Sequence, residues 1–470
     1  MVQSLIFFVM MKRKLSFTAL TGMLLVLLGA SISISSCTQK QEKVQEPFAV
    51  EHLDWVSTAT IYEVNVRQFT PEGTFNAFAQ SLPRLKELGV DVLWFMPVHP
   101  IGVENRKGTL GSYYSIKDYK GTNPEFGTFD DFKAMVDEAH SLDMKVIIDW
   151  VANHTSHDAV WVTSNPEFYT RDSVGNLISP FDWTDVAELD FENKKLWDAM
   201  IDAMKYWVEE ADIDGFRCDV AGEVPTEFWN KARRELDAVK PMFMLAEAEK
   251  PELQEYAFDA DYGWEFHHIK NEIAKGKKTV MDLDQYVLKS ESTYPRNTIK
   301  MNFTSNHDEN SWNGTEFERL GEGVKAFAAL TYVMPGMPLI YNGQEVGFNR
   351  RLQFFEKDLI DWTENAEMTN FYTKLNQLKE ENTALAAGPD GGEMIRVKTS
   401  NDVNVFALIR RAENDEVFSI FNLSPLVQTI ALQGDEFVGD YTNYLTGEAQ
   451  TFTGSDTLEL APWQYVVLAK

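Results

Sequence analysis

Three carboxylates stand where the sequence predicts that β-strands end. Asp219 lies in the segment GFRCDV, Glu247 follows the apolar residues MLA, and Asp308 follows the segment FTSNH. Apolar and β-branched residues that stop at small or polar ones are typical of buried strands. Because the parallel strands of a barrel bring their carboxyl ends to one face, we expect the three acids to share a site. Two carboxyl groups in one site can serve as a nucleophile and a proton donor.

The spacing in GFRCDV places a cation beside one of these acids. Arg217 and Asp219 are two residues apart on a predicted strand, so both side chains point to the same face. An opposite charge nearby lowers a carboxyl pKa, and the arginine is therefore expected to keep Asp219 ionised. Glu247 follows Leu245 and Ala246, an apolar flank that would raise its pKa and hold it protonated. A carboxylate nucleophile and a protonated carboxylic acid are the pair that cleaves a glycosidic bond with retention.

Further polar clusters stand at two other predicted strand ends. They are residues 149–154 (DWVANH) and residues 111–119 (GSYYSIKDY). His307 precedes Asp308, and this acid would bind sugar hydroxyls and raise the pKa of Glu247 by like charge. A lone acid at a strand end is usually a cap or a surface group, but five such clusters together predict a shared active site.

Strand and helix patterns alternate between residues 54 and 387. The predicted strands are residues 61–69, 90–97, 144–151, 215–220, 242–246, 298–304 and 338–341, with a vaguer one inside 258–268. The predicted helices are residues 76–88, 197–208, 228–239, 324–333 and 364–381. Alternation of this kind implies parallel pairing, and the length favours a catalytic (β/α)8 barrel, also called a TIM barrel.

Two segments depart from this alternation. Residues 155–192 are too long for an ordinary loop and predict a short excursion domain after strand 3. We assign its aromatic side chains to the core of that small domain; they are Trp161, Phe168, Phe181 and Trp183. From residue 388 to 470 the pattern changes to short alternating strands without helices, which predicts a C-terminal antiparallel β-sandwich.

The N-terminal sequence is typical of an export signal. A basic cluster at residues 12–14 precedes an apolar run to about Ile34, and small residues then lead to Cys37. Ile34-Ser-Ser-Cys37 resembles a bacterial lipobox, so residues 1–37 are interpreted as a lipoprotein signal peptide lipidated at Cys37, and residues 38–53 as a tether. The protein is then an exported, membrane-anchored lipoprotein on the periplasmic or cell-surface face. The alternative is a spanning helix, and Met11 is a second candidate start.

Composition limits the classes of partner. The chain of 470 residues has 44% hydrophobic and 13% aromatic residues, enough for a large core and more than one domain. Its 43 basic and 72 acidic residues give a formal net charge of −29. A surface this acidic repels phosphate backbones, so nucleic acid is not expected as a partner. The second cysteine, Cys218, lies within a predicted strand as a small buried hydrophobe, and no disulfide is expected.

Taken together, the five clusters resemble the conserved regions of the α-amylase family, glycoside hydrolase family 13, here in a bacterial lipoprotein form. DWVANH resembles the first region, GFRCDV the second, MLAEAE the third and FTSNHD the fourth. Shorter matches occur at residues 336–347 (GMPLIYNGQEVG) and 187–190 (AELD). The resemblance runs from about Trp55 to the C-terminus, and four regions in order are far more specific than one motif.

The resemblance implies a role for each matched residue. Asp219 would be the nucleophile, Glu247 the acid/base, and Asp308 the third catalytic carboxylate. The side chains that it places around the substrate are Tyr114, His154, Arg217 and His307. Asn153 matches a calcium-ligand position, although an asparagine at a strand end is also typical of a turn. Calcium is therefore the one cofactor that the resemblance offers, and no organic cofactor is implied.

The activity implied is that of a retaining α-glycoside hydrolase acting on α-glucosidic bonds, above all α-1,4 bonds, in starch, maltooligosaccharides or related α-glucans. Transglycosylation and α-1,6 specificity stay open, and Val220 after the nucleophile resembles the α-1,6-acting branch. Gly222 and Glu223 stand where starch-acting members often carry a basic residue and then a histidine. A catalytically inactive, membrane-tethered binding subunit is the alternative of a different class, and the complete set of acids disfavours it.

Overall fold

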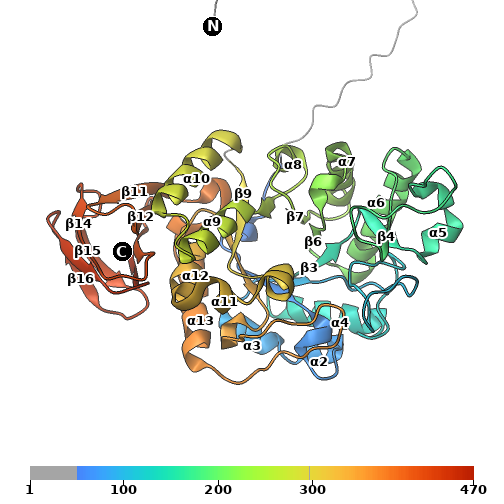
Figure 1. Cartoon of the computed structure of the whole chain (residues 1–470), viewed down its shortest axis with the longest axis horizontal. Coiled ribbons are helices and arrows are strands. Elements are labelled where there is room, and N and C mark those ends of the chain that lie inside the picture. The colour runs from blue at the N-terminus through green and yellow to red at the C-terminus, as the bar shows by residue number, and fades with distance from the viewer. Residues whose placement is uncertain (1–49, 296) are drawn as a thin grey trace, which may run out of the picture. The chain divides into compact units, whose positions relative to one another are not determined.

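The computed structural model describes residues 50–295 and 297–470, and its central feature is a closed barrel of parallel strands (Figure 1). The barrel strands are β1 (Ile61–Val64), β2 (Val92–Phe95), β3 (Lys145–Trp150), β6 (Gly215–Cys218), β7 (Phe243–Ala246), β8 (Ala260–Tyr262), β9 (Ile299–Phe303) and β10 (Met337–Tyr341). Around the barrel their order is β1-β10-β9-β8-β7-β6-β3-β2. The predicted (β/α)8 barrel is confirmed, and Cys37 with most of the predicted tether lies outside the described residues.

Two predicted elements before β2 were wrong in kind or in number. The strand predicted for residues 61–69 ends at Val64, and a one-turn helix α1 (Val66–Phe69) follows it. The single helix predicted for residues 76–88 is two helices, α2 (Phe75–Ala79) and α3 (Leu82–Leu88). Proline lacks an N–H and suits the first turn of a helix, so Pro83 lies in the first turn of α3 and not in the interior of one continuous helix.

Side chains along each strand alternate between the two faces of the barrel wall. On β7, Phe243 and Leu245 pack in the barrel interior, whereas Met244 and Ala246 pack against the outer helices. Gly215 at the start of β6 has no room for a side chain, because a Cβ there would lie 2.1 Å from the carbonyl oxygen of Phe243. The same alternation turns Arg217 inward and Cys218 outward, where Cys218 is a buried free thiol.

Helices cover the outside of the barrel. The longer ones are α4 (Phe129–Ser141), α6 (Lys194–Ala211), α7 (Thr226–Asp237), α9 (Trp264–Ala274), α10 (Val280–Thr293), α12 (Val324–Val333) and α13 (Ala366–Glu381). Shorter ones are α8 (Leu253–Tyr256) and α11 (Glu316–Leu320). The predicted helix 324–333 matches α12 at both ends. Thr128 and Asp131 form a capping box at the start of α4, which fixes where this helix begins.

Residues between β3 and α6 form the predicted excursion. Its two strands, β4 (His154–Ser156) and β5 (Val186–Glu188), pair antiparallel, and a short helix α5 (Val160–Ser164) lies between them in sequence. β4 begins four residues after β3 ends, so the excursion lies beside the carboxyl end of the barrel.

The C-terminal part is an antiparallel sheet of eight strands. They are β11 (Glu393–Thr399), β12 (Val405–Arg411), β13 (Glu416–Asn422), β14 (Gln428–Gln433), β15 (Gly439–Asn443), β16 (Ala449–Phe452), β17 (Thr457–Leu460) and β18 (Tyr465–Ala469). Strands from both edges share one core, in which the Phe418 ring contacts those of Tyr441 and Phe452. The antiparallel arrangement predicted for this region is confirmed.

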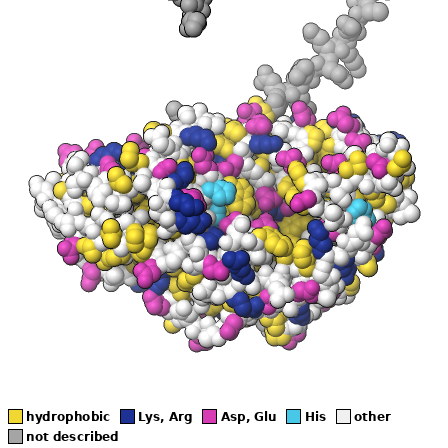
Figure 2. Space-filling model, viewed as in Figure 1, with side chains coloured by type: hydrophobic (Ala, Val, Ile, Leu, Met, Phe, Trp, Pro, Cys, Tyr) yellow, Lys and Arg dark blue, Asp and Glu magenta, His cyan; other side chains and the backbone are white. Residues whose placement is uncertain are grey.

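The barrel and the C-terminal sheet belong to one compact unit that contains every described residue. None of the helices in the described part of the chain is long and apolar enough to cross a membrane. Acidic and basic side chains are interspersed with hydrophobic ones over the face shown in Figure 2.

Candidate active site

A cavity of about 640 Å³ opens at the carboxyl end of the barrel. Six of the predicted site residues line it: Tyr114, His154, Asp219, Glu247, His307 and Asp308. Arg217 is fully buried beneath them. The structure therefore brings together the three acids and all four predicted substrate-binding residues. Arg217 lies within β6, and the others lie in segments after β2, β3, β6, β7 and β9.

The Arg217 guanidinium contacts the candidate nucleophile and the candidate proton donor. Its Nη1 donates to Oδ1 of Asp219 at 3.0 Å and to Oδ1 of Asp149 at 2.8 Å. Its Nη2 lies 2.9 Å from Oε2 of Glu247, an ion-pair distance without hydrogen-bond geometry. Nε donates to the hydroxyl of Tyr262 at 3.0 Å. Asp149 and Tyr262 thus fix the arginine from below, while its cavity side is shared between the two acids.

Burial dominates the titration of Asp219. Burial raises its pKa, Arg217 lowers it and Asp149 raises it, with the result that the pKa lies at about 6. The sequence-based expectation had the direction of the arginine effect right and the net shift wrong. Asp219 follows a strand and is 7% exposed, so its carboxylate loses most of its hydration, a cost that the neighbouring cation offsets only in part.

Glu247 holds its proton more tightly than Asp219 does. Burial raises its pKa to about 7, opposed by Arg217 and helped by the charges of Asp219 and Asp308. The expectation that Asp308 raises the Glu247 pKa is consistent with this pattern. At a pH between these two values, Asp219 is the acid that ionises and Glu247 the one that keeps a proton, as a nucleophile and a proton donor require.

The backbone of Val220 also contacts the proton donor. Its N–H donates to Oε2 of Glu247 at 2.8 Å. Val220 has φ +36° and ψ +44°, in the left-handed region that a β-branched residue rarely adopts. Strained backbone of this kind concentrates at functional sites. Here the strain turns the N–H toward the Glu247 carboxylate.

His307 lies between two carboxylates and a tyrosine. Its Nδ1 bonds Oε1 of Glu63, and its Nε2 lies 2.8 Å from the Tyr114 hydroxyl and 3.2 Å from Oδ2 of Asp308. Burial lowers the His307 pKa, but Asp308 and Glu63 outweigh it and raise the pKa well above its ordinary value. The imidazolium in turn outweighs burial at Asp308 and holds the pKa of that acid below its usual range. Asp308 is therefore an ionised acceptor for sugar hydroxyls.

Tyr114 provides an aromatic surface at the base of the cavity. Its ring stacks on His307 with centroids 5.3 Å apart and an interplanar angle of 21°. Its hydroxyl donates to Oδ2 of Asp149 at 3.0 Å. Because both ends of the side chain are fixed, the ring is held ready to contact a sugar.

His154 is held neutral at the edge of the excursion. Burial lowers its pKa to about 4, although Asp185 raises it. Its ring packs edge-to-face on Trp183 with centroids 5.4 Å apart. Trp183 itself lines the cavity. Its assignment to the core of the excursion was therefore wrong, whereas Phe168 is buried as expected.

Sequence reasoning missed several residues of this site. Glu63 is fully buried in β1 and bonds His307, and a single acid in the apolar run IYEV was the signal for it. Trp312, Phe354 and Phe355 form an aromatic wall of the cavity, with the Trp312 ring 5.3 Å from that of Phe354. Trp312 lies in a π-helical turn, Glu309–Asn313, directly after Asp308. No motif in the sequence marked these aromatics.

The predicted calcium position, Asn153, already has neighbours within the protein. The Asn153 amide lies 3.3 Å from Nδ1 of His154, and its backbone carbonyl accepts from the N–H of Leu189. Within residues 50–295 and 297–470, no group of three or more His, Cys, Asp or Glu side chains is placed to hold a metal ion. No catalytic step is assigned to calcium.

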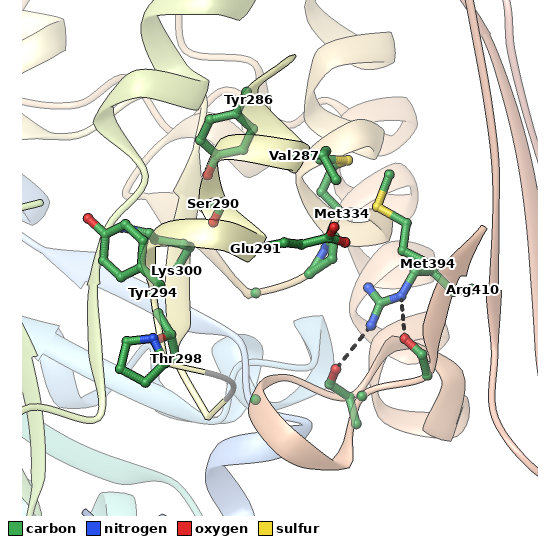
Figure 3. Close-up of a pocket in the computed structure, with 17 residues that line it drawn as sticks. Tyr286, Val287, Ser290, Glu291, Tyr294, Thr298, Lys300, Met334, Met394 and Arg410 are labelled. Carbon is green, nitrogen blue, oxygen red and sulfur yellow. Dashed lines mark hydrogen bonds between the residues drawn. The ribbon is translucent and has the colours of Figure 1, made fainter. Parts of the chain in front are cut away.

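A second cavity, of about 470 Å³, lies between α10 and the C-terminal sheet (Figure 3). Arg410 in its wall donates to the carbonyl oxygens of Gly392 and Ala386 at 3.1 and 3.4 Å. Lys300 pairs with Asp261 at 2.7 Å. None of the predicted site residues lines this cavity, and its cations already have partners.

Comparison with known proteins identifies the family of this chain. The family model described as alpha amylase, catalytic domain, matches residues 38–186 and 179–387 of the chain. The chain belongs to the α-amylase family. The segments that resemble the conserved regions of α-amylases thus belong to one closed barrel, and residues from these segments line a single cavity.

Relatives and solved structures of this family resemble most of the chain. Alpha-amylase MalA of Haloarcula japonica is 26% identical over 85% of this chain, which spans 60% of that protein's length. The structure of a noncanonic maltogenic alpha-amylase, AmyB from Thermotoga neapolitana, is 30% identical, with 88% of this chain and 98% of that one covered and a TM-score of 0.81. An alpha-amylase structure from Lactobacillus plantarum is 32% identical, with coverages of 88% and 99% and a TM-score of 0.80. These comparisons support the assignment of the chain as a glycosidase of the α-amylase type that hydrolyses α-glucans. The relatives also include a maltosyltransferase.

Proposed function

We propose that this α-amylase family member hydrolyses α-1,4-glucosidic bonds in starch or maltooligosaccharides with retention at the anomeric carbon. In the first step an oxygen of Asp219 attacks the anomeric carbon, while Glu247 gives its proton to the leaving oxygen. In the second step Glu247 takes a proton from water, the water oxygen attacks the same carbon, and the bond to Asp219 breaks.

The arrangement around Arg217 is the single observation that carries this assignment. One guanidinium contacts both acids, and their pKa values of about 6 and about 7 leave the nucleophile ionised and the proton donor protonated over one interval of pH. Asp308 is kept ionised by His307 and would accept hydroxyl hydrogen bonds from the bound ring.

Product analysis on three substrates tests the proposal. We expect amylose to be cleaved, pullulan to be cleaved at α-1,4 bonds if at all, and isomaltose to stay intact. Cleavage of isomaltose would instead assign α-1,6 specificity to the enzyme. Products longer than the starting maltooligosaccharide would favour transfer to sugar over transfer to water, and no product from any α-glucan would favour a binding subunit.

We further propose that the mature chain is a bacterial lipoprotein anchored through Cys37, on the periplasmic or cell-surface face. The support is the sequence alone, because Cys37 follows a basic and then an apolar segment that ends in small residues. Cys37→Ala expressed in a bacterial host should move the protein from the membrane fraction to the soluble fraction or block processing. Unchanged membrane retention would favour a spanning segment.

A further inference from the structure

The loop of residues 101–111 stands opposite the proton donor. It follows β2, and the segment 353–356 follows β10; these two strands flank β1 in the barrel. Glu247 follows β7, which is four strands from β1 in either direction around the closed barrel. The two segments therefore lie across the barrel mouth from Glu247.

These two segments are bonded into one wall. The Leu110 N–H donates to the carbonyl oxygen of Phe355 at 3.1 Å, and the Thr109 N–H donates to Oε1 of Glu356 at 2.9 Å. Gly108 has φ +64°, and a Cβ there would lie 2.4 Å from Cβ of Phe355. The loop is thus pressed against the segment after β10 with no space for a sugar between them.

The loop is also fixed internally and to the excursion. The Arg106 guanidinium donates to the carbonyl oxygens of Gly102 and Ile101 at 2.8 and 3.2 Å, so it fastens the loop to its own base. On the other side, the Asp158 carboxylate accepts the Val103 N–H at 3.1 Å. The wall therefore continues from the segment after β10, through residues 101–111, to the excursion.

An ion pair completes this wall inside the cavity. Nζ of Lys107 lies 2.8 Å from Oδ1 of Asp185, and both residues line the catalytic cavity. The Asp185 side chain is 6% exposed, and the Ser115 hydroxyl donates to its backbone carbonyl at 3.1 Å. The neighbouring His154, whose pKa lies at about 4, carries no charge that could replace the lysine.

We propose that the Lys107–Asp185 ion pair closes the glycone end of the catalytic cavity, so that the enzyme removes short maltooligosaccharides from the non-reducing ends of α-glucans. This inference rests on the proposed hydrolysis. Glu247 protonates the leaving oxygen, so the aglycone lies on its side of the cleaved bond and the glycone extends the other way. In an α-1,4-glucan the glycone end is the non-reducing end.

The cost of opening the Lys107–Asp185 ion pair depends on the burial of Asp185. A longer glycone could pass only if Lys107 moved away from Asp185. That movement would leave the Asp185 carboxylate, whose side chain is 6% exposed, without the counter-charge of Lys107, whose side chain is 38% exposed. An uncompensated carboxylate at a nearly buried position is costly. A substrate that binds with a short glycone leaves the ion pair intact and is therefore favoured at this site.

The test compares two forms of maltoheptaose, each with a chromophore at the reducing end. One has a free non-reducing end and the other carries a blocking group there. The intact enzyme should cleave the free form into short products of fixed length and leave the blocked form nearly untouched. Lys107→Ala should raise the ratio of blocked to free cleavage by about tenfold or more, a typical effect of reshaping a substrate pocket.

Matched variants separate the ion pair from general damage. Lys107→Arg keeps the charge and should keep the ratio of the intact enzyme. Asp185→Asn removes one charge with little change in size and should raise the ratio as Lys107→Ala does. Lys120→Ala removes another lysine ion pair, with Asp202, outside the cavity and should leave the ratio unchanged.

Two results would overturn the proposal: equal cleavage of both forms by the intact enzyme, or an unchanged ratio in correctly folded Lys107→Ala and Asp185→Asn. A complete lack of cleavage of both forms would instead overturn the hydrolysis on which it rests.

Discussion

Nη2 of Arg217 lies 2.9 Å from Oε2 of Glu247, and the other terminal nitrogen of the same guanidinium donates to Asp219. The arginine lowers the pKa of both acids, while burial raises both and the charge of Asp219 raises the pKa of Glu247 further. Because the two acids interact, their protons leave in steps that belong to the pair. The site has one ionised and one protonated member over a narrow interval of pH.

The first prediction is a bell-shaped pH profile of kcat/KM on a maltooligosaccharide. Below about 6 Asp219 gains a proton and can no longer attack, so activity falls on the acid side. Above about 7 Glu247 loses its proton and can no longer protonate the leaving oxygen, so activity falls on the alkaline side. Initial rates between pH 4 and 9 measure both limbs. A profile flat through this range would contradict the assignment of the two acids.

Removal of a neighbouring charge should move both limbs of that profile in the same direction. The Asp308 carboxylate raises the pKa of Glu247 and that of Asp219 by like charge. In Asp308→Asn both pKa values should fall, so the alkaline and the acid limb of the residual activity should move to lower pH. The control Asp440→Asn, on the exposed surface of β15, should leave both limbs in place. A shift of the alkaline limb to higher pH would show that Asp308 acts on Glu247 in another way.

Substitution of the nucleophile should abolish turnover without unfolding the chain. Asp219→Asn has nearly the same volume but cannot form the glycosyl ester, so we expect kcat/KM to fall by about 10³ or more, or about 4 kcal/mol. Circular dichroism and the melting temperature should stay close to those of the unsubstituted protein. Retention of more than a few per cent of the activity would assign the nucleophile to another residue.

The stereochemistry of the first product tests both catalytic roles at once. Two successive inversions at one carbon return the α configuration. Proton NMR during the first minutes of maltooligosaccharide cleavage, before mutarotation, should therefore show the α-anomer at the new reducing end. Early appearance of the β-anomer would mean direct attack by water and no covalent bond to Asp219.

Local sequence patterns were enough to predict most of the elements and to place the three candidate catalytic acids at strand ends that share one cavity. Strand periodicity located all eight barrel strands and put Arg217 and Asp219 on one face, because side chains two apart on a strand share a direction. Helix α12 was predicted with both ends correct, and Met334 leaves the helical conformation directly before Pro335, because a proline disfavours helical conformation at the residue that precedes it. Alternation in the last part of the chain likewise predicted antiparallel strands.

Only the tertiary structure decided what surrounds those acids. Glu63 bonds His307, which is 244 residues away in the sequence. Lys107, in the loop after β2, forms an ion pair with Asp185 in the excursion. The net upward shift of the Asp219 pKa also depends on burial, which no spacing reveals. Periodicity along a chain reports which side of an element faces the core. Distances between elements, and the loss of water around a charge, are set by how the closed barrel packs its loops together.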